Sequence, residues 1–207
     1  MNSPSDRGAV GRVYEDVKNR ILSGELRLRE RLDIDDLART YRVSGTPVRQ
    51  ALSCLAFERL IAPHPTRGFH VVLWSEKGLR CLYDWRGMLA CLAAETSERI
   101  APAKIPNGVV IYADAVASLL QRLNANSNVE LARAAINADE RLRAARMVEP
   151  DLMPECETEL AALTKAMVDG TLEQLQTVLR AYHQRRAERA GEIRARALLR
   201  ALPEEDE

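Results

Sequence analysis

The chain has 207 residues, which places it between one large domain and two small ones. Hydrophobic residues make up 46% and charged residues 29%, so the chain can bury a core and the class of disordered proteins is excluded. Aromatic residues are only 4%, and the abundance of Leu, Ala, Arg and Glu favours helices over sheets. Because no apolar run approaches the ~20 residues of a membrane span and the first residues lack a signal-peptide pattern, we expect a cytoplasmic protein without a membrane partner.

The charges are balanced overall, with 30 basic and 30 acidic residues, but they divide unevenly along the chain. Residues 1–74 hold 12 lysines and arginines against 9 aspartates and glutamates. This modest excess of positive charge suggests that the N-terminal part meets a polyanion. The four cysteines show no metal-ligand spacing, and we interpret them as reduced thiols that fill the core.

The N-terminal part predicts three short helices. Val13, Val17 and Ile21 recur at helical spacing before Gly24, which indicates an amphipathic helix. Asp33 is placed to cap a second helix. Thr46 followed by Pro47 predicts the N-cap and the first position of a third helix, because the missing N–H of proline costs nothing there. The third helix has one apolar stripe, formed by Val48, Ala51, Leu52 and Leu55.

Two short β-prone runs follow, at residues 60–62 and 69–73, around a connector rich in Pro, Thr and Gly. This pattern predicts a β-hairpin. A helix, a helix-turn-helix and a hairpin in this order predict a winged helix-turn-helix.

From residue 75 onward the periodicity is helical. It predicts one helix ending before residues 100–108, a second carrying Val116 and Leu120, and others near 129–147, 155–169 and 172–201. Thr171 and Gln174 form a capping-box pattern at the start of the last helix. We therefore expect a mostly α protein: a disordered N-terminus at 1–11, a winged helix-turn-helix with a small β-hairpin wing at 12–74, an all-α bundle at 75–202 and an acidic tail at 203–207.

Residues 12–72 resemble the DNA-binding domain of GntR-family bacterial transcription regulators. The resemblance is carried by "VYEDVKNRILSGELRLRERL", "DIDDLARTYRVSGTPVRQAL" and "HPTRGFHV". The helical remainder resembles the effector-binding domain of the FadR-type branch through "DWRGMLACLAAE", "NADERLRAARM" and "ELAALTKAMVDGTLEQLQTVLRAYHQRR". The sequence has no GxSxG, no phosphate-binding glycine loop and no HExxH motif, so we expect no enzymatic activity. We expect a ligand-responsive regulator, a repressor more than an activator. Because one small winged helix makes too few phosphate contacts for tight binding, we expect a homodimer on a palindromic operator in double-stranded DNA.

A recognition helix enters the major groove with its N-terminal end. Small and hydroxylated residues there permit close approach, and hydroxyl and backbone N–H groups favour phosphate. Arg49, one turn further, is a candidate for guanine or phosphate. The family usually has an arginine where this chain has Gly45, so the operator preference is expected to differ. The candidate DNA-binding residues are Arg39, Ser44, Gly45, Thr46, Pro47, Arg49, Gln50, Arg67 and Gly68.

Many FadR-type domains hold a metal ion with one aspartate and three histidines. Here the corresponding pattern begins at Asp139, but Arg143, Leu160 and Tyr182 stand at the other ligand positions. Two of the three histidines, His64 and His70, lie in the predicted wing. We therefore predict that the metal site is lost and that no cofactor is bound.

An arginine inside a bundle needs an anion. For Arg143 the sequence supports two interpretations equally: an internal pair with Asp139, or a carboxylate ligand held by the arginine fork. The candidate effector-binding residues are Arg86, Asp139, Arg143, Tyr182 and His183. The partner would be a small organic acid. The alternative is a helical domain that has lost ligand binding and serves only dimerisation or protein interaction.

Overall fold

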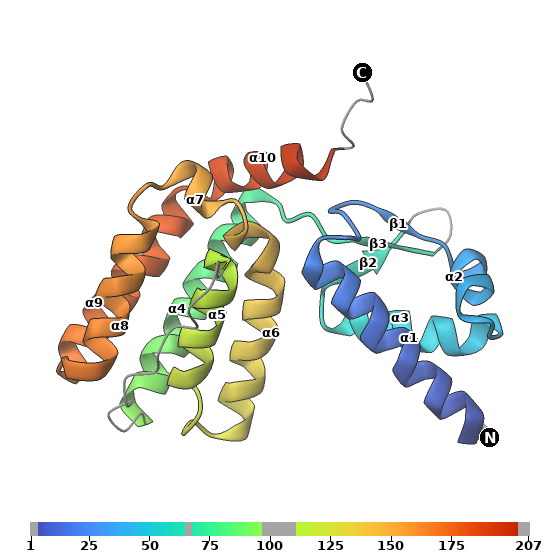
Figure 1. Ribbon diagram of the computed structural model, residues 1–207, viewed down its shortest axis with the longest axis horizontal. Helices are drawn as coiled ribbons and strands as arrows, with labels where there is room; N and C mark the ends of the chain where they lie inside the picture. Colours follow the sequence, from blue (N-terminus) through green and yellow to red (C-terminus); the bar gives the residue numbers. More distant parts are fainter. Residues whose placement is uncertain (1–3, 65–67, 97–110, 203–207) are drawn as a thin grey trace. The chain divides into compact units, whose positions relative to one another are not determined.

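The computed structural model describes residues 4–64, 68–96 and 111–202. The chain divides into two units, one comprising residues 1–73 with 198–207 and the other residues 74–197. Helices dominate both units, and the only strands among the described residues form one small sheet in the first. The expected fold class, a winged helix-turn-helix followed by an all-α bundle, is confirmed (Figure 1).

The first unit contains α1 (Pro4–Ser23), α2 (Ile34–Tyr41) and α3 (Gly45–Phe57). Its core forms where the apolar stripes of these helices meet: Val17, Val48 and Leu52 are each fully buried. Because α1 already begins at Pro4, the expectation that residues 1–11 are disordered is wrong for residues 4–11. The predicted inner stripe of the third helix is confirmed, since its four members are all buried at 0% exposure.

The sheet of the first unit has three strands in the order β1–β3–β2, all antiparallel to their neighbours. The predicted hairpin is present as β2 (Ile61–Pro63) and β3 (Phe69–Val71), with Ala62 opposite His70. The sequence did not predict β1 (Arg31–Leu32), which pairs Leu32 with Phe69. A strand of two residues is too short for its alternation to be recognised.

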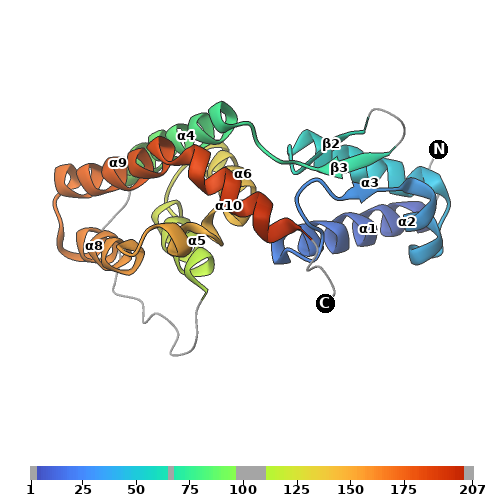
Figure 2. The same cartoon turned by 90° about the horizontal axis from the view of Figure 1, so that it is seen from above.

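The second unit consists of helices alone. In both Figure 1 and Figure 2, α4 (Glu76–Thr96) and α9 (Leu172–Glu188) run side by side, and the closest helix packing in the unit is between these two. α5 (Tyr112–Leu123), α6 (Val129–Arg146) and α8 (Cys156–Asp169) complete the bundle around a core that includes Leu120, Leu163 and Leu179.

Two predictions for the second unit need correction. The last helix was expected to run unbroken over 172–201, but it ends at Glu188 and a separate helix, α10 (Ala190–Ala201), follows. A short helix, α7 (Glu149–Leu152), was not expected. The capping box at Thr171 and Gln174 is confirmed in both directions, Thr171 Oγ1 accepting from Gln174 N at 3.2 Å and Gln174 Oε1 from Thr171 N at 2.8 Å.

Two of the four cysteines contradict the interpretation as core-filling thiols. Cys54 and Cys81 are exposed, whereas Cys156 is buried and Cys91 is half-buried. All four are free. No helix among the described residues is both long enough and apolar enough to span a membrane.

Candidate nucleic-acid interface and buried charge cluster

The N-terminal end of α3 is an exposed helix terminus with little of its own capping. Ser44 is the N-cap residue, with extended backbone angles (φ −71°, ψ 166°), but its side chain makes no capping hydrogen bond. The prediction of Thr46 as N-cap is therefore wrong, since the helix starts two residues earlier. The first N–H groups of a helix have no partner within it. They carry partial positive charge, so this end of α3 suits an anion such as a phosphate.

The candidate residues of α3 divide by the face on which they lie. Ser44, Thr46 and Arg49 are exposed, and Gln50 is half-buried. Pro47, one of the predicted DNA-binding residues, is buried. Pro47 therefore anchors the first turn in the core, and the helical rotation that buries it turns Thr46 and Arg49 outward.

Gly45 has room for a larger side chain. A Cβ atom at this position would meet Ile34 Cγ2 at 3.6 Å, which is ordinary van der Waals contact. The absence of an arginine at this position is therefore not imposed by packing within the domain.

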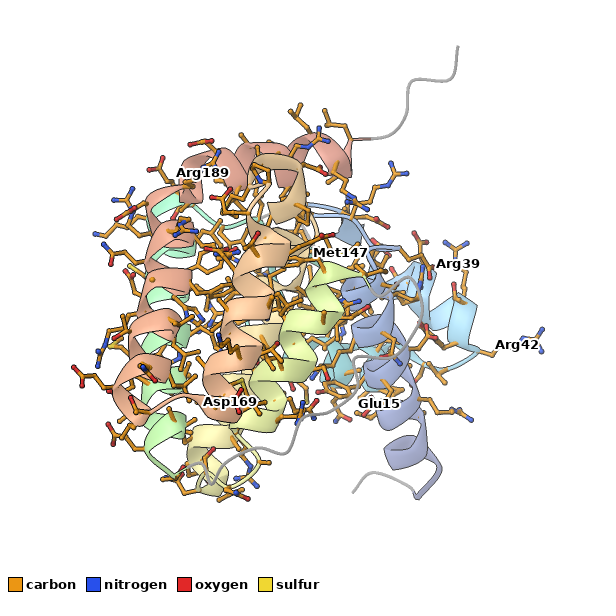
Figure 3. All side chains as sticks on the ribbon, turned by 60° about the vertical axis from the view of Figure 1, so that its left-hand side comes forward. Glu15, Arg39, Arg42, Met147, Asp169 and Arg189 are labelled. Carbon is orange, nitrogen blue, oxygen red and sulfur yellow. The ribbon has the colours of Figure 1, made fainter. Side chains whose placement is uncertain are left out.

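Two further arginines precede α3, Arg39 in the last turn of α2 and Arg42 directly after that helix. Arg42 follows α2 with a left-handed backbone (φ 54°), and its N–H closes that helix on Ala38 O and Arg39 O. The Arg39 side chain is 80% exposed and pairs with Asp36. Figure 3 shows the side chains of Arg39 and Arg42 extending outward from the protein.

In the wing, Gly68 has a structural role that only glycine fills. Its φ is +83°, and a Cβ atom would stand 2.5 Å from Leu32 O. Gly68 thus lets the wing cross closely over the end of β1. Arg67, the other wing candidate, lies outside the described residues.

The second unit contains a buried carboxylate held by two arginines. Asp139 accepts hydrogen bonds from Arg86 Nε (2.8 Å) and Nη2 (3.1 Å) and from Arg146 Nη2 (2.7 Å). The side chains of Arg86 and Arg146 are 0% and 1% exposed. Burial alone would raise the pKa of Asp139, but the neighbouring charges of Arg146 and Arg86 outweigh it and lower that pKa. Asp139 is therefore ionised at neutral pH.

This group of three has one positive charge in excess and unused donors. Arg86 Nη1 and Arg146 Nε and Nη1 have no hydrogen-bond partner within the described part of the chain. Buried guanidinium N–H groups without acceptors are costly. These donors would be satisfied by an additional acceptor close to Arg86 and Arg146, either a water molecule or an anion.

His183 lies beside this group. Its Nδ1 is 2.8 Å from Leu179 O, which requires the proton on Nδ1 and leaves a lone pair on Nε2. Nε2 has no partner among the described residues. Burial first, and the charge of Arg86 second, lower the pKa of His183 to about 3. His183 is therefore neutral at physiological pH and can accept a hydrogen bond.

A neighbouring cluster is, by contrast, saturated. Glu149 is fully buried and accepts from Tyr83 Oη (2.6 Å) and Arg186 Nε (2.8 Å). Arg186 also donates to Tyr182 O (3.0 Å), Tyr112 Oη (2.7 Å) and Glu159 Oε2 (2.7 Å). Because each nitrogen of this guanidinium has an acceptor, the Arg186 cluster is a structural network.

Tyr182 belongs to this network rather than to the group around Asp139. Its ring lies under the Arg186 guanidinium at 3.6 Å. Burial and the charge of Glu149 raise the pKa of Tyr182 to about 12, so its hydroxyl remains protonated.

The expected pair between Arg143 and Asp139 needs correction. Arg143 pairs with Asp114 of α5, in a setting where the two side chains are 24% and 44% exposed. The arginines that neutralise Asp139 are Arg86 and Arg146. The sequence reasoning missed Arg146, although its spacing from Leu142 and Ala138 on α6 places it on the buried face.

The residues present do not fit the metal ion that FadR-type domains commonly hold. Asp139 already accepts from two guanidinium groups, whose net positive charge repels a cation. Arg143 and Tyr182 are engaged elsewhere, and Leu160 is partly buried against the apolar core. Within the described ranges, no group of three His, Cys, Asp or Glu side chains is arranged to hold a metal.

Comparisons with known proteins agree with this geometry. Residues 9–71 match the model of the family described as "Bacterial regulatory proteins, gntR family". A curated relative from Paraburkholderia xenovorans (strain LB400), named "Uncharacterized HTH-type transcriptional regulator BphR", is 36% identical over 91 residues, which cover 44% of this chain and 37% of the relative. The chain thus matches little more than a third of that relative's length.

Two solved structures share the fold over nearly the whole chain. The putative transcriptional regulator GntR from Rhodococcus sp. RHA1 has a TM-score of 0.68 at 18% identity, covering 88% of this chain and 97% of its own. The E. coli protein McbR/YncC has a TM-score of 0.60 at 19% identity, covering 93% and 99%. The matched family and the relatives with descriptive names are regulators of transcription, not enzymes. Within the first unit, residues 9–71 are thus similar to the gntR family, and the two solved structures show that the fold is shared.

Proposed function

We propose that this chain, whose residues 9–71 match the gntR family, is a homodimeric DNA-binding transcription regulator of the FadR-type branch. It acts in the cytoplasm as a repressor, and a small carboxylate ligand in the helical unit controls it. The observation that carries the DNA-binding part is the exposed terminus of α3, where Ser44, Thr46 and Arg49 face outward from a buried anchor at Pro47.

The chemistry of this terminus explains how it would bind DNA. The unpaired N–H groups and hydroxyls of the first turn contact phosphate, which positions the helix. Arg49 then reaches a base edge, and a bidentate contact to guanine contributes about 1–3 kcal/mol of discrimination. One such domain makes few phosphate contacts. Two copies double them, and an operator with two half-sites follows from the two-fold symmetry.

Arg49→Ala tests this assignment. We expect the variant to lose specific operator binding in a fluorescence anisotropy titration at physiological salt while keeping weak binding to unrelated DNA. Arg133→Ala is the matched control, because Arg133 is an exposed arginine of the other unit, paired with Glu130. Unchanged discrimination by Arg49→Ala between operator and unrelated DNA would show that the recognition helix has been assigned wrongly.

The observation that supports ligand control is the positive charge in excess around Asp139. A carboxylate would accept from Arg86 Nη1 and Arg146 Nη1, while His183 Nε2 accepts a hydrogen bond from a ligand hydroxyl or a bridging water. Of the proposed effector residues, Arg86 and Asp139 belong to this group, and His183 lies beside it. Tyr182 and Arg143 would act only at its border.

Thermal unfolding in the presence of small organic acids tests ligand control. Both tryptophans, Trp74 and Trp85, lie in the second unit, so their fluorescence reports its unfolding. A ligand that binds only the native state raises the melting temperature. We expect a rise with at least one acid, its loss in Arg146→Gln, and its retention in Arg133→Gln on the same helix. No rise with any acid would favour the alternative, a helical unit that serves only dimerisation or protein interaction.

A further inference from the structure

The outer face of α4 carries an apolar stripe that the bundle does not cover. Trp85, Met88 and Leu92 are 44%, 55% and 49% exposed, and Cys81 is exposed as well. These four residues, which we call the α4 seam, follow one another at spacings of four, three and four. That spacing is typical of a helix that packs along a second helix. On each of the other helices, at most two large hydrophobic residues of the described chain are exposed.

The α4 seam borders a groove. The groove has a volume of about 650 Å³ and lies between α4 and α9, with Met88, Cys91 and Leu92 on one wall and Gln176 and Arg180 on the other. Figure 1 shows these two helices side by side. Large exposed apolar surface next to a groove marks an interaction site more often than chance exposure does.

We propose that the α4 seam is the contact between two copies of this chain, with the two α4 helices antiparallel about a two-fold axis that passes between residues 86 and 87. The inference rests on the proposed homodimer and adds which surface forms it. A two-fold contact must be complementary to itself, and this helix meets that condition about that point.

The apolar positions match under this symmetry. Trp85 lies opposite Met88 of the partner subunit, and Cys81 lies opposite Leu92 of the partner subunit. In both pairs, therefore, apolar side chains face each other across the two-fold axis. Trp85 would enter the groove of the partner subunit, and a buried tryptophan in a pocket is a common centre of binding energy.

The charges match as well. Lys77 stands at the exposed N-terminal end of the same face, and Glu95 stands exposed at its C-terminal end. The antiparallel arrangement brings Lys77 close to Glu95 of the partner subunit, twice in the dimer. A parallel arrangement would place like charges together, so the charge pattern selects the antiparallel one.

Analytical ultracentrifugation of Met88→Asp in the full chain tests the surface. We expect the dissociation constant of the dimer to rise at least about 30-fold, because the change places a charge at an apolar contact in both subunits. Ile136→Asp is the matched control, since Ile136 is 44% exposed on α6, and it should leave the dimer unchanged. A dimer that withstands Met88→Asp would overturn the proposal.

Disulfide cross-linking tests the same surface without a substitution that weakens the dimer. In a Cys54→Ser background, Leu92→Cys should form a disulfide with Cys81 of the partner subunit on mild oxidation, giving a dimer on a non-reducing gel. Adding Cys81→Ser should abolish that product. Failure to cross-link, with a wild-type chain that is dimeric, would refute the α4 seam but not the dimer. A wild-type chain that is monomeric at every concentration would refute the proposed homodimer itself, and the seam contact with it.

Discussion

At the level of single residues, the fold of the first unit depends on particular backbone positions. Gly68 is the clearest case, because its positive φ and its approach to Leu32 O leave no space for a Cβ atom. The sequence placed Gly68 among the DNA-binding candidates. The structure shows that Gly68 also has a steric role, because it lets the chain pass close to Leu32 O.

Gly68→Ala should therefore destabilise the first unit by about 2–3 kcal/mol, because it combines a left-handed alanine with a steric clash. Urea unfolding followed by circular dichroism measures the change. Gly11→Ala is the control: Gly11 lies in α1 with nothing within 4 Å of a Cβ atom, and alanine should stabilise that helix slightly. Equal effects of the two substitutions would contradict this account of the wing.

In the second unit, the buried ion pairs of Asp139 should contribute much more to stability than the partly exposed pair of Asp114 with Arg143. Asp139→Asn removes the charge that neutralises both Arg86 and Arg146, and we expect a loss of about 3–5 kcal/mol in the free energy of unfolding. Asp114→Asn breaks the partly exposed pair with Arg143 and should cost less than about 1 kcal/mol. Tryptophan fluorescence during urea unfolding gives both values. A small effect of Asp139→Asn would contradict the description of that group as a buried charge cluster.

The low pKa of His183 makes the stability of the second unit dependent on pH. The folded protein keeps His183 neutral down to about pH 3, whereas an unfolded histidine binds a proton below about pH 6.5. The unfolded state therefore binds more protons below pH 6.5, and stability falls as the pH decreases from there toward 3. Between pH 6.5 and pH 5 we expect the free energy of unfolding, measured by tryptophan fluorescence, to fall by about 1.5 kcal/mol. His183→Gln should reduce this dependence of the free energy of unfolding on pH. An unchanged dependence would contradict the assignment of the effect to His183.

At the level of secondary structure, α2 has a well-formed N-cap at Asp33 and a strained C-cap at Arg42. Asp33 Oδ1 accepts from Asp35 N (2.8 Å) and Asp36 N (3.3 Å), while Arg42 closes the other end with a left-handed backbone. A non-glycine residue in that conformation carries a cost of about 1–2 kcal/mol. α2 therefore begins at a well-capped end and leads into α3 through a strained C-cap.

Substitutions at the two ends of α2 should have opposite signs. Asp33→Ala should lower the free energy of unfolding by about 1 kcal/mol, because two N–H groups lose their acceptor. Arg42→Gly should raise it by about 0.5–1 kcal/mol, because glycine adopts the left-handed region without strain. Urea unfolding of the full chain by circular dichroism compares them. If Arg42→Gly lowered the free energy of unfolding, the contacts of the arginine side chain would stabilise the fold by more than the left-handed backbone destabilises it.

The sequence predicted helices and strands well where an apolar periodicity extends over many residues. It predicted them less well where an element depends on contacts with distant parts of the chain. The apolar stripe of α3 could be assigned because four residues repeat at helical spacing, and the box at Thr171 has its own sequence pattern. The two residues of β1 and the break at Arg189 leave no such pattern. The buried group around Asp139 was found only in part, since sequence spacing favours a partner one turn away, such as Arg143. The partners that the fold supplies are Arg86, from another helix, and Arg146, two turns along α6.

At the level of the whole molecule, the two units carry different candidate functional features. The first presents the terminus of α3 and the wing, and the second holds a buried charge cluster and the exposed α4 seam. A ligand can regulate DNA binding only through a difference in its affinity for two states of the protein. In the account proposed here, that difference arises in a second unit that also joins two copies of the chain.

DNase I footprinting of the wild-type protein on the region upstream of its own gene tests the proposed DNA binding. We expect protection of a palindrome whose two half-sites lie about one helical turn, or a multiple of one, apart. We also expect protection to weaken steeply as salt rises, and Arg49→Ala to give none. A wild-type protein that protects no sequence even at low ionic strength would contradict the account.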